Sequence, residues 1–204
     1  LGDMDLDHPL DAVLASASAR GVEIHWIAGN HDGDRVAWHD HLFASALAAG
    51  NLTGRVTAAA GLRVAGLGGV FSEKVWHPKA GDGEPVYETR DSCLASLAPR
   101  RLWRGGLPMK HRVFVWYEDV LELFDQGADV LVTHEAPSSH RYGFCEIDDL
   151  ANALGARLIV HGHHHEAYAA LLPDGTRVRG LAKTEIVDAD ALLTGDAAAF
   201  VNRK

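Results

Sequence analysis

The sequence predicts a layered α/β fold with a mixed β-sheet. In the first part of the chain, helical and strand patterns alternate, which favours strands that run parallel with helices packed against the sheet. Near the carboxyl end, two apolar runs flank Pro173-Asp174-Gly175. An Asp-Gly pair between such runs is typical of the turn in an antiparallel hairpin. Together these observations predict a sheet that contains both parallel and antiparallel strands.

The first third of the chain shows the alternation most clearly. Pro9 lies where the first turn of a helix tolerates proline, and Gly21 and Gly50 lie where helices end. The strands of this part are short apolar runs. In chain order we expect a helix at residues 9–19, a strand at 22–28, a helix at 35–49, and strands at 55–57 and 62–67.

The carboxyl-terminal half repeats the pattern. Gly127 and Gly155 each follow a helical pattern, and an apolar run then leads into a histidine-containing loop. In chain order we expect a helix at residues 117–126, a strand at 130–133, a helix at 147–154, a strand at 157–160, and hairpin strands at 168–172 and 176–181.

Residues 68–112 differ from both parts. They are rich in Gly, Pro, Trp and charge, and their periodicity is weak, which predicts a long surface excursion with a short helix near 91–97. Such a segment can form a lid or a specificity loop over a site, or it can only cover the sheet. We therefore expect a single domain over residues 1–204 with a loop excursion at about 68–112.

The composition restricts the class of protein. The net charge of −9 repels nucleic-acid phosphates unless a local positive centre compensates, so a nucleic acid is not the expected partner. No apolar run is long enough to span a bilayer, and no secretory signal is visible. Cys93 and Cys145 lack metal-binding or redox spacing, which predicts two free, buried or half-buried thiols in a reducing compartment, here the cytoplasm. Oligomeric state leaves no trace.

Residues that can bind metal open the chain or directly follow predicted strands. They are Asp3, Asn30, His134, His163 and His165, with His31 next to Asn30. Because open α/β sheets build their sites in loops at the carboxyl ends of strands, we expect these side chains to converge. Imidazole and carboxylate groups bind Zn, Mn and Fe. The pattern therefore predicts a site for divalent metals, in which one carboxylate can bridge two ions about 3.5–4 Å apart.

These residues resemble the motifs of the calcineurin-like metallophosphoesterases. Four of the five ordered motifs of that family are present: Gly2-Asp3, Gly29-Asn30-His31-Asp32, Thr133-His134-Glu135-Ala136-Pro137 and Gly162-His163-His164-His165. The resemblance implies a β-sandwich of mixed sheets flanked by helices. It also implies a metal-dependent hydrolase of phosphate mono- or diesters.

The resemblance implies a role for each matching residue. Asp3 would bridge two divalent ions, which could be Mn, Fe or Zn. Asn30, His134 and His163 would complete the second ion, and His165 would bind the first.

The resemblance also implies a catalytic mechanism. His31 would contact the phosphate and help to protonate the leaving oxygen, while a metal-bound hydroxide attacks phosphorus. The substrate would be a phosphoester, a small molecule rather than a polymer. Neither the metal nor the choice between monoester and diester follows from the sequence.

Two departures from the family pattern matter. The first motif, D-x-H, is absent. It would lie on a strand before Gly2-Asp3, so we expect a natural protein that is longer at the amino end, a sheet without its first strand, and one full metal site. In related protein phosphatases a second Asp three residues after the Gly-Asp motif orients the catalytic His. Here Leu6 stands at that position, between Asp5 and Asp7, which leaves open the carboxylate that orients His31.

Two other functions remain open. The missing motif also suits a metal-binding domain of this fold that is catalytically inactive. A nuclease of the same fold shares the chemistry, but the acidic charge and the lack of a basic, aromatic groove disfavour it. The run at residues 100–104, Arg-Arg-Leu-Trp-Arg, is the segment that could grip phosphate or stack a base.

The remaining polar residues of interest have simpler expected roles. His39 and His41 are expected on the surface of a helix, His161 in the core, and His164 outside the ligand set. Asp32 could hold the loop around it or act near His31, and both roles stay open.

Overall fold

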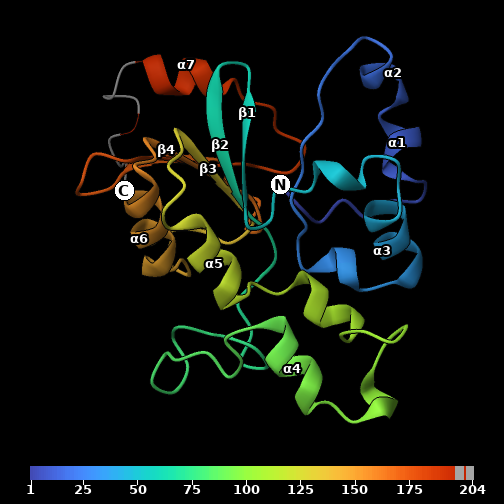
Figure 1. Cartoon of the computed structure of the whole chain (residues 1–204). Helices are drawn as coiled ribbons and strands as arrows, with labels where there is room; N and C mark the ends of the chain where they lie inside the picture. The colour runs from blue at the N-terminus through green and yellow to red at the C-terminus, as the bar shows by residue number, and fades with distance from the viewer. Residues whose placement is uncertain (196–199, 201–204) are drawn as a thin grey trace.

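The computed structural model describes residues 1–195 and 200 and is built on a six-stranded sheet of order β1-β2-β3-β4-β6-β5 (Figure 1). The strands are β1 (Arg55–Ala59), β2 (Leu62–Leu67), β3 (Val130–Thr133), β4 (Leu158–His161), β5 (Tyr168–Leu171) and β6 (Arg177–Gly180). The four inner strands run parallel, whereas β1 and β5 pair antiparallel at the two edges. This mixed sheet with flanking helices confirms the predicted α/β class.

The sheet differs from the expected one in two respects. All six strands of the described residues belong to one sheet, where the resemblance implied a sandwich. The segment 22–28 forms only one bridge, from Trp26 to Asn51, instead of a strand. A ladder needs a partner of similar length. Here the partner segment is confined between η2 (Ala48–Gly50) and the turn at Gly54, whose φ is 71°.

The helices expected at 9–19, 35–49 and 117–126 are shorter than the sequence predicts, whereas the one expected at 147–154 begins earlier, at Cys145. The observed helices are α1 (Leu10–Val13), α2 (Ala15–Ser18), α3 (Val36–Phe43), α4 (Arg90–Ser96), α5 (Tyr117–Leu123), α6 (Cys145–Leu154) and α7 (Ala189–Thr194), with 3₁₀ turns η1 (His31–Gly33), η2, η3 (Pro99–Arg101) and η4 (Met109–Val113). The helix expected at 9–19 breaks at Leu14, and α2 buries no side chain that would hold it. The helix expected at 35–49 ends at Phe43, where the Ser45 hydroxyl donates to the Leu42 carbonyl and competes with the helical bonds.

Successive residues of the central strands face two different cores. Leu131 of β3 and Ile159 of β4 pack with residues of α5 and α6. Their neighbours Val130 and Leu158 pack on the other side with Leu193 of α7. This alternation follows from the period of two along a strand. Helices therefore cover both faces of the sheet. The loops after β3 and β4 begin at the ends of buried strands, which hold the start of each loop in place.

The amino-terminal segment and α1 to α3 lie together beside the sheet, and the segment that carries α4 lies on another side of it (Figure 1). A third apolar cluster, which includes Leu6, Trp26 and Leu42, holds the amino-terminal group together. The division into one domain with an excursion at 68–112 stays a prediction.

Two further expectations concern the cysteines and the membrane. Both cysteines are free, and Cys93 is buried as predicted, but Cys145 is exposed, which contradicts the prediction for that residue. Within residues 1–195, every helix is too short or too polar to cross a bilayer.

Candidate metal centre

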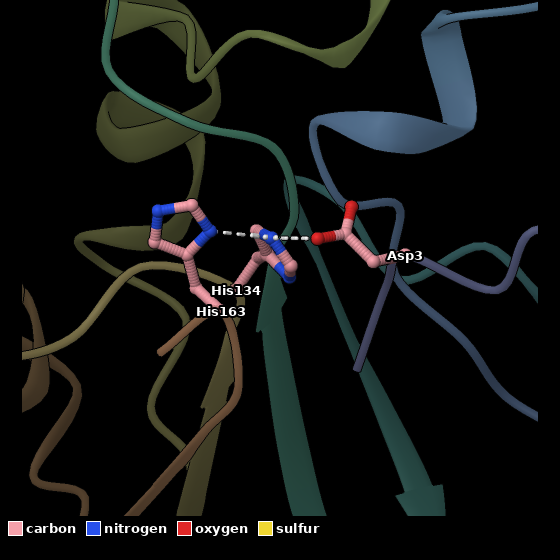
Figure 2. A group of neighbouring side chains, drawn as sticks. All are labelled: Asp3, His134 and His163. Carbon is pink, nitrogen blue, oxygen red and sulfur yellow. Dashed lines mark hydrogen bonds and ion pairs between the residues drawn. The ribbon is translucent and has the colours of Figure 1, made fainter. Parts of the chain in front are cut away.

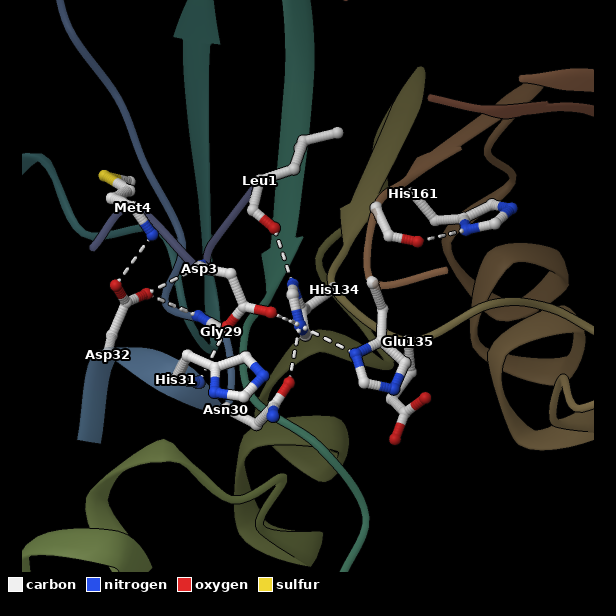
Figure 3. Close-up of polar contacts among 12 residues, drawn as sticks. Leu1, Asp3, Met4, Gly29, Asn30, His31, Asp32, His134, Glu135 and His161 are labelled. Atoms are coloured by element: carbon white, nitrogen blue, oxygen red, sulfur yellow. Dashed lines mark hydrogen bonds and ion pairs between the residues drawn. The ribbon is translucent and has the colours of Figure 1, made fainter. Parts of the chain in front are cut away.

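Four polar atoms from four separate segments meet at the carboxyl end of the sheet (Figures 2 and 3). The Nε2 atom of His134 lies 3.3 Å from Oδ2 of Asp3, 3.1 Å from Oδ1 of Asn30 and 3.1 Å from Nδ1 of His163. His134 follows β3, and His163 lies just beyond β4. The structure therefore brings together four of the five residues that the sequence proposes as metal ligands.

The hydrogen bond made by the other ring nitrogen of His134 shows which of its two nitrogens carries the proton. The Nδ1 atom of His134 lies 2.7 Å from the carbonyl oxygen of Leu1, and a carbonyl can only accept, so Nδ1 carries the proton. In the neutral ring, Nε2 then presents a lone pair to the Asp3 carboxylate, the Asn30 oxygen and His163. With the proton of His163 on Nε2, its Nδ1 is an acceptor as well, and a cation would then satisfy all four groups at once.

The protonation of the neighbours agrees with this arrangement. Burial, together with the adjacent His134, lowers the pKa of His163 to about 4, so its imidazole is neutral near pH 7. Burial pushes the pKa of Asp3 upward, but the His134 imidazole and the backbone N–H of His31 outweigh it and hold the pKa below its ordinary value. The centre thus offers a neutral imidazole at His163 and an ionised carboxylate at Asp3, the forms in which these groups bind metal.

The loops that carry these groups are held in an uncommon backbone conformation. Asp3, Asp5, His163 and His165 have φ values of 54°, 47°, 64° and 55°. A non-glycine residue with positive φ costs about 1–2 kcal/mol, and such residues concentrate at functional sites. Four of them around one centre indicate that the fold positions these side chains at the expense of local backbone stability.

Gly29 and Asp32 hold the amino-terminal loop in place. A Cβ atom on Gly29 would lie 2.3 Å from Oδ1 of Asp3 and 2.5 Å from Cε1 of His134, so only glycine fits there. The buried carboxylate of Asp32 accepts hydrogen bonds from the backbone N–H groups of Gly29, Asp3 and Met4 at 2.8, 3.0 and 2.9 Å. Of the two roles left open for Asp32, the structure shows the one that holds the loop.

His31 lies beside these ligands and faces the solvent. Its backbone N–H donates to Oδ1 of Asp3 at 2.7 Å, and its Nδ1 lies 2.6 Å from Oδ2 of Asp34. The hydrogen bond to Asp34 raises the pKa of His31. Lys110 contacts the same carboxylate. The group that orients His31 is therefore Asp34, three residues further along, whereas the sequence pattern directed attention to the region of Asp5 and Asp7.

His165 is the proposed ligand that does not join the cluster. It lines the same cleft as Asp3, His31, His134 and His163. Within residues 1–195, however, no group of three ligand atoms within 4.8 Å of one another includes it. The structure thus gathers Asp3, Asn30, His134 and His163 around one point, and His165 lies outside that group.

His163 also belongs to a second group of possible ligand atoms. It consists of Glu135, His163 and His164, whose ligand atoms lie within 4.8 Å of one another. Burial raises the pKa of Glu135 to about 7, although its Oε1 accepts a hydrogen bond from the Phe71 N–H at 3.2 Å. Glu135 was not among the residues predicted to bind metal, and its place directly after His134 is the one signal for it in the sequence.

Among the remaining histidines, His161 agrees with the prediction and His39 contradicts it. His161 is buried, as expected, and its Nε2 lies 2.8 Å from the Tyr168 hydroxyl. His164 stacks on His140 with ring centroids 3.9 Å apart. His39 is buried rather than exposed, because α3 packs it against Phe43, and this expectation was wrong.

The chain is similar to one protein family and to a bacterial relative. The family model described as calcineurin-like phosphoesterase matches residues 2–167. An uncharacterized protein of Haemophilus influenzae (strain Rd) is 38% identical over 170 residues, which cover 82% of this chain and 72% of that relative. The family match spans the four motifs and the loops that bring Asp3, Asn30, His134 and His163 together. The chain therefore belongs to the calcineurin-like phosphoesterase family.

Proposed function

We propose that the protein is a metal-dependent hydrolase of phosphate mono- or diesters. The observation that carries this proposal is the set of acceptor atoms around Nε2 of His134, each within 3.3 Å of it. A bound divalent ion would supply positive charge to phosphoryl oxygens and an activated water. In this proposal Asp3, Asn30, His134 and His163 hold that ion, and Asp3 and His165 contribute to a second one.

His31 is the residue that we propose for proton transfer. Its side chain is 54% exposed and lines the cleft beside Asp3. Asp34 holds its Nδ1, so its Nε2 is free to approach a leaving oxygen of the substrate. The raised pKa of His31 favours the protonated ring, which is the form that can donate this proton.

The proposed substrate is a small phosphoester. The cleft that contains His31 and Asp3 has a volume of about 750 Å³ and is also lined by Asp5, Asp34 and Glu185. These carboxylates and the net charge of −9 oppose a polyanionic chain. The free thiols of Cys93 and Cys145 support a location in the cytoplasm.

The first test compares His31→Ala with His8→Ala, a matched change at an exposed histidine outside the centre. Both proteins are stripped with EDTA, reloaded with Mn²⁺, and assayed on p-nitrophenyl phosphate and on bis-p-nitrophenyl phosphate. We expect His31→Ala to lower kcat roughly 10²- to 10⁴-fold, with the bound Mn²⁺ unchanged. His8→Ala should match the parent protein.

Two outcomes distinguish the enzyme from the catalytically inactive domain, and a third tests the metal centre. Hydrolysis that requires Mn²⁺ and His31 supports the enzyme. Stoichiometric metal binding without hydrolysis of either ester supports the catalytically inactive domain instead. Metal binding that survives His134→Ala would contradict the centre itself, because Nε2 of that residue lies within 3.3 Å of the other three proposed ligands.

A further inference from the structure

Part of the cleft that contains the metal centre is apolar. Met4, Val13, Leu14 and Trp38 line this cleft together with His31, and we call these four apolar residues the apolar patch. Val13 is 52% exposed, and the other three residues are partly exposed. A ligand in the cleft can therefore contact the patch directly, as in small-molecule sites where apolar walls surround a few polar groups.

The fold holds the apolar patch in a fixed place. α1 and α3 lie next to each other (Figure 1), and Met4 and Leu14 pack against the buried apolar cluster that joins these helices. The Asp11 carboxylate accepts a hydrogen bond from the Ala46 N–H at 3.1 Å, which ties α1 to the segment after α3. The patch is thus a surface of the folded core and keeps its position beside the metal centre.

Trp38 is the largest side chain of the apolar patch and is not used to build a core. Within the described residues, it belongs to none of the three apolar clusters. The Arg35 guanidinium covers one face of its ring, 4.4 Å from the centroid. Trp38 lies in the first turn of α3, just after the 3₁₀ turn that carries His31. Because helical side chains lean toward the amino end of their helix, the indole is directed back toward that turn.

The charges of the cleft leave no positive excess for a second anionic group. Asp34 and Glu185 each pair with a basic side chain that lies outside the lining. Asp5 and Lys183 line the cleft without an ion pair inside residues 1–195, and their opposite charges offset each other. Away from the metal centre, the cleft therefore favours an uncharged, apolar group over a further phosphate or carboxylate.

We propose that the cleft takes phosphoesters of apolar, aromatic alcohols, and that Trp38 determines this specificity. This inference rests on the proposed function, because it places the phosphate at the metal centre beside His31. The ring of the alcohol lies on Val13, Leu14 and the exposed part of the Trp38 indole. Burial of this ring and its contact with the indole stabilise the bound substrate.

The test compares two phosphonates that cannot be hydrolysed as esters, on the full chain loaded with Mn²⁺. Benzylphosphonate carries an aromatic ring, and methylphosphonate presents the same anionic group without one. Isothermal titration calorimetry measures the dissociation constant of each. We expect benzylphosphonate to bind roughly 10-fold more tightly, because its ring is removed from water on the apolar patch.

Trp38→Ala should reduce this preference to about threefold or less and leave the affinity for methylphosphonate unchanged. Trp103→Ala is the matched control. Trp103 is also a partly buried indole under a guanidinium group, that of Arg104 at 4.4 Å, and it lies outside the cleft. This control should keep the full preference, and circular dichroism checks that both variants are folded.

A milder variant tests the apolar patch where packing is not at stake. Val13→Asn replaces apolar atoms at a position that is 52% exposed, and the two residues have similar helix propensity. It should lower the preference for benzylphosphonate about two- to threefold. Val22→Asn, at a position that is 51% exposed and outside the cleft, should leave it unchanged.

The inference and the proposed function fail on different results. Equal affinities for the two phosphonates, or no binding of either, overturn the inference even where p-nitrophenyl phosphate is hydrolysed. A preference that persists unchanged in Trp38→Ala and in Val13→Asn overturns it as well, because the ring then lies elsewhere. A preference for benzylphosphonate that both variants reduce, without hydrolysis of either ester, supports the apolar patch and contradicts the proposed function alone.

Discussion

At the scale of single residues, the exposed side chain of His31 depends on Asp34 for its orientation. Packing does little to restrain a ring that is 54% exposed, so the 2.6 Å contact between Nδ1 and the Asp34 carboxylate sets its direction. Lys110 contacts the other oxygen of that carboxylate and donates to the Asn30 carbonyl at 3.2 Å. Asp34 is therefore a positioning residue for His31.

The substitution Asp34→Asn tests this role. It keeps the shape of the side chain but removes the charge-assisted hydrogen bond, whose loss corresponds to roughly a 10- to 100-fold decrease in kcat. KM and the amount of bound Mn²⁺ should stay the same, because Asp34 is not among the proposed ligands. Steady-state kinetics and metal analysis check both points, with the exposed Asp7→Asn as the control. An unchanged kcat would show that His31 needs no orienting carboxylate.

At the scale of elements, the centre depends on two loops that a single carboxylate joins. Asp32 lies in η1, directly after the Gly29-Asn30-His31 segment, and its oxygens bind the backbone of Asp3 and Met4 at the start of the chain (Figure 3). Burial raises the pKa of Asp32, although three backbone N–H groups bind its carboxylate. This contact between loops, rather than a strand ladder, places Asp3 beside His134.

The substitution Asp32→Ala should therefore disturb stability and metal binding together. It leaves three backbone donors without their partner, and we expect the free energy of unfolding to fall by about 2–4 kcal/mol. Urea denaturation of the protein without metal measures this change, and Mn²⁺ titration should show weaker binding. Asp149→Ala, at an exposed position of α6, provides the control. Equal stability of the two variants would mean that water replaces the carboxylate at no cost.

At the scale of the whole molecule, the proposed ligands come from segments that are far apart in sequence. Asp3 and His163 are separated by most of the chain, and the unfolded protein has no such site. Metal binding must then favour the folded state by mass action. The same acidic residues that gather at the cleft repel one another in the absence of a cation.

Metal removal should thus lower the stability of the entire fold. At an Mn²⁺ concentration about 100 times the dissociation constant, we expect a gain of about 2.7 kcal/mol over the protein in EDTA. Thermal or urea unfolding with and without Mn²⁺ measures the difference. His134→Ala should abolish this gain, and His8→Ala should preserve it. A gain that persists in His134→Ala would place the ion elsewhere.

Predicted strands agree with the observed ones where both the apolar pattern and a neighbouring strand are present. The strands expected at 62–67 and 130–133 coincide with β2 and β3, because their apolar runs are buried on both faces of the sheet. The strand expected at 22–28 has the same apolar character but lacks a partner of sufficient length. Strand propensity is local, whereas a ladder also requires a neighbour.

The sequence by itself determined the family motifs, the α/β class and the histidine-bearing loops after β3 and β4, because each depends on short-range patterns and on the period of two along a strand. Only the tertiary structure decided that Asp34 orients His31, that Asp32 joins two loops, and that His39 is buried. These contacts join residues across turns or between distant segments, where side-chain direction depends on how the elements pack and not on spacing along the chain.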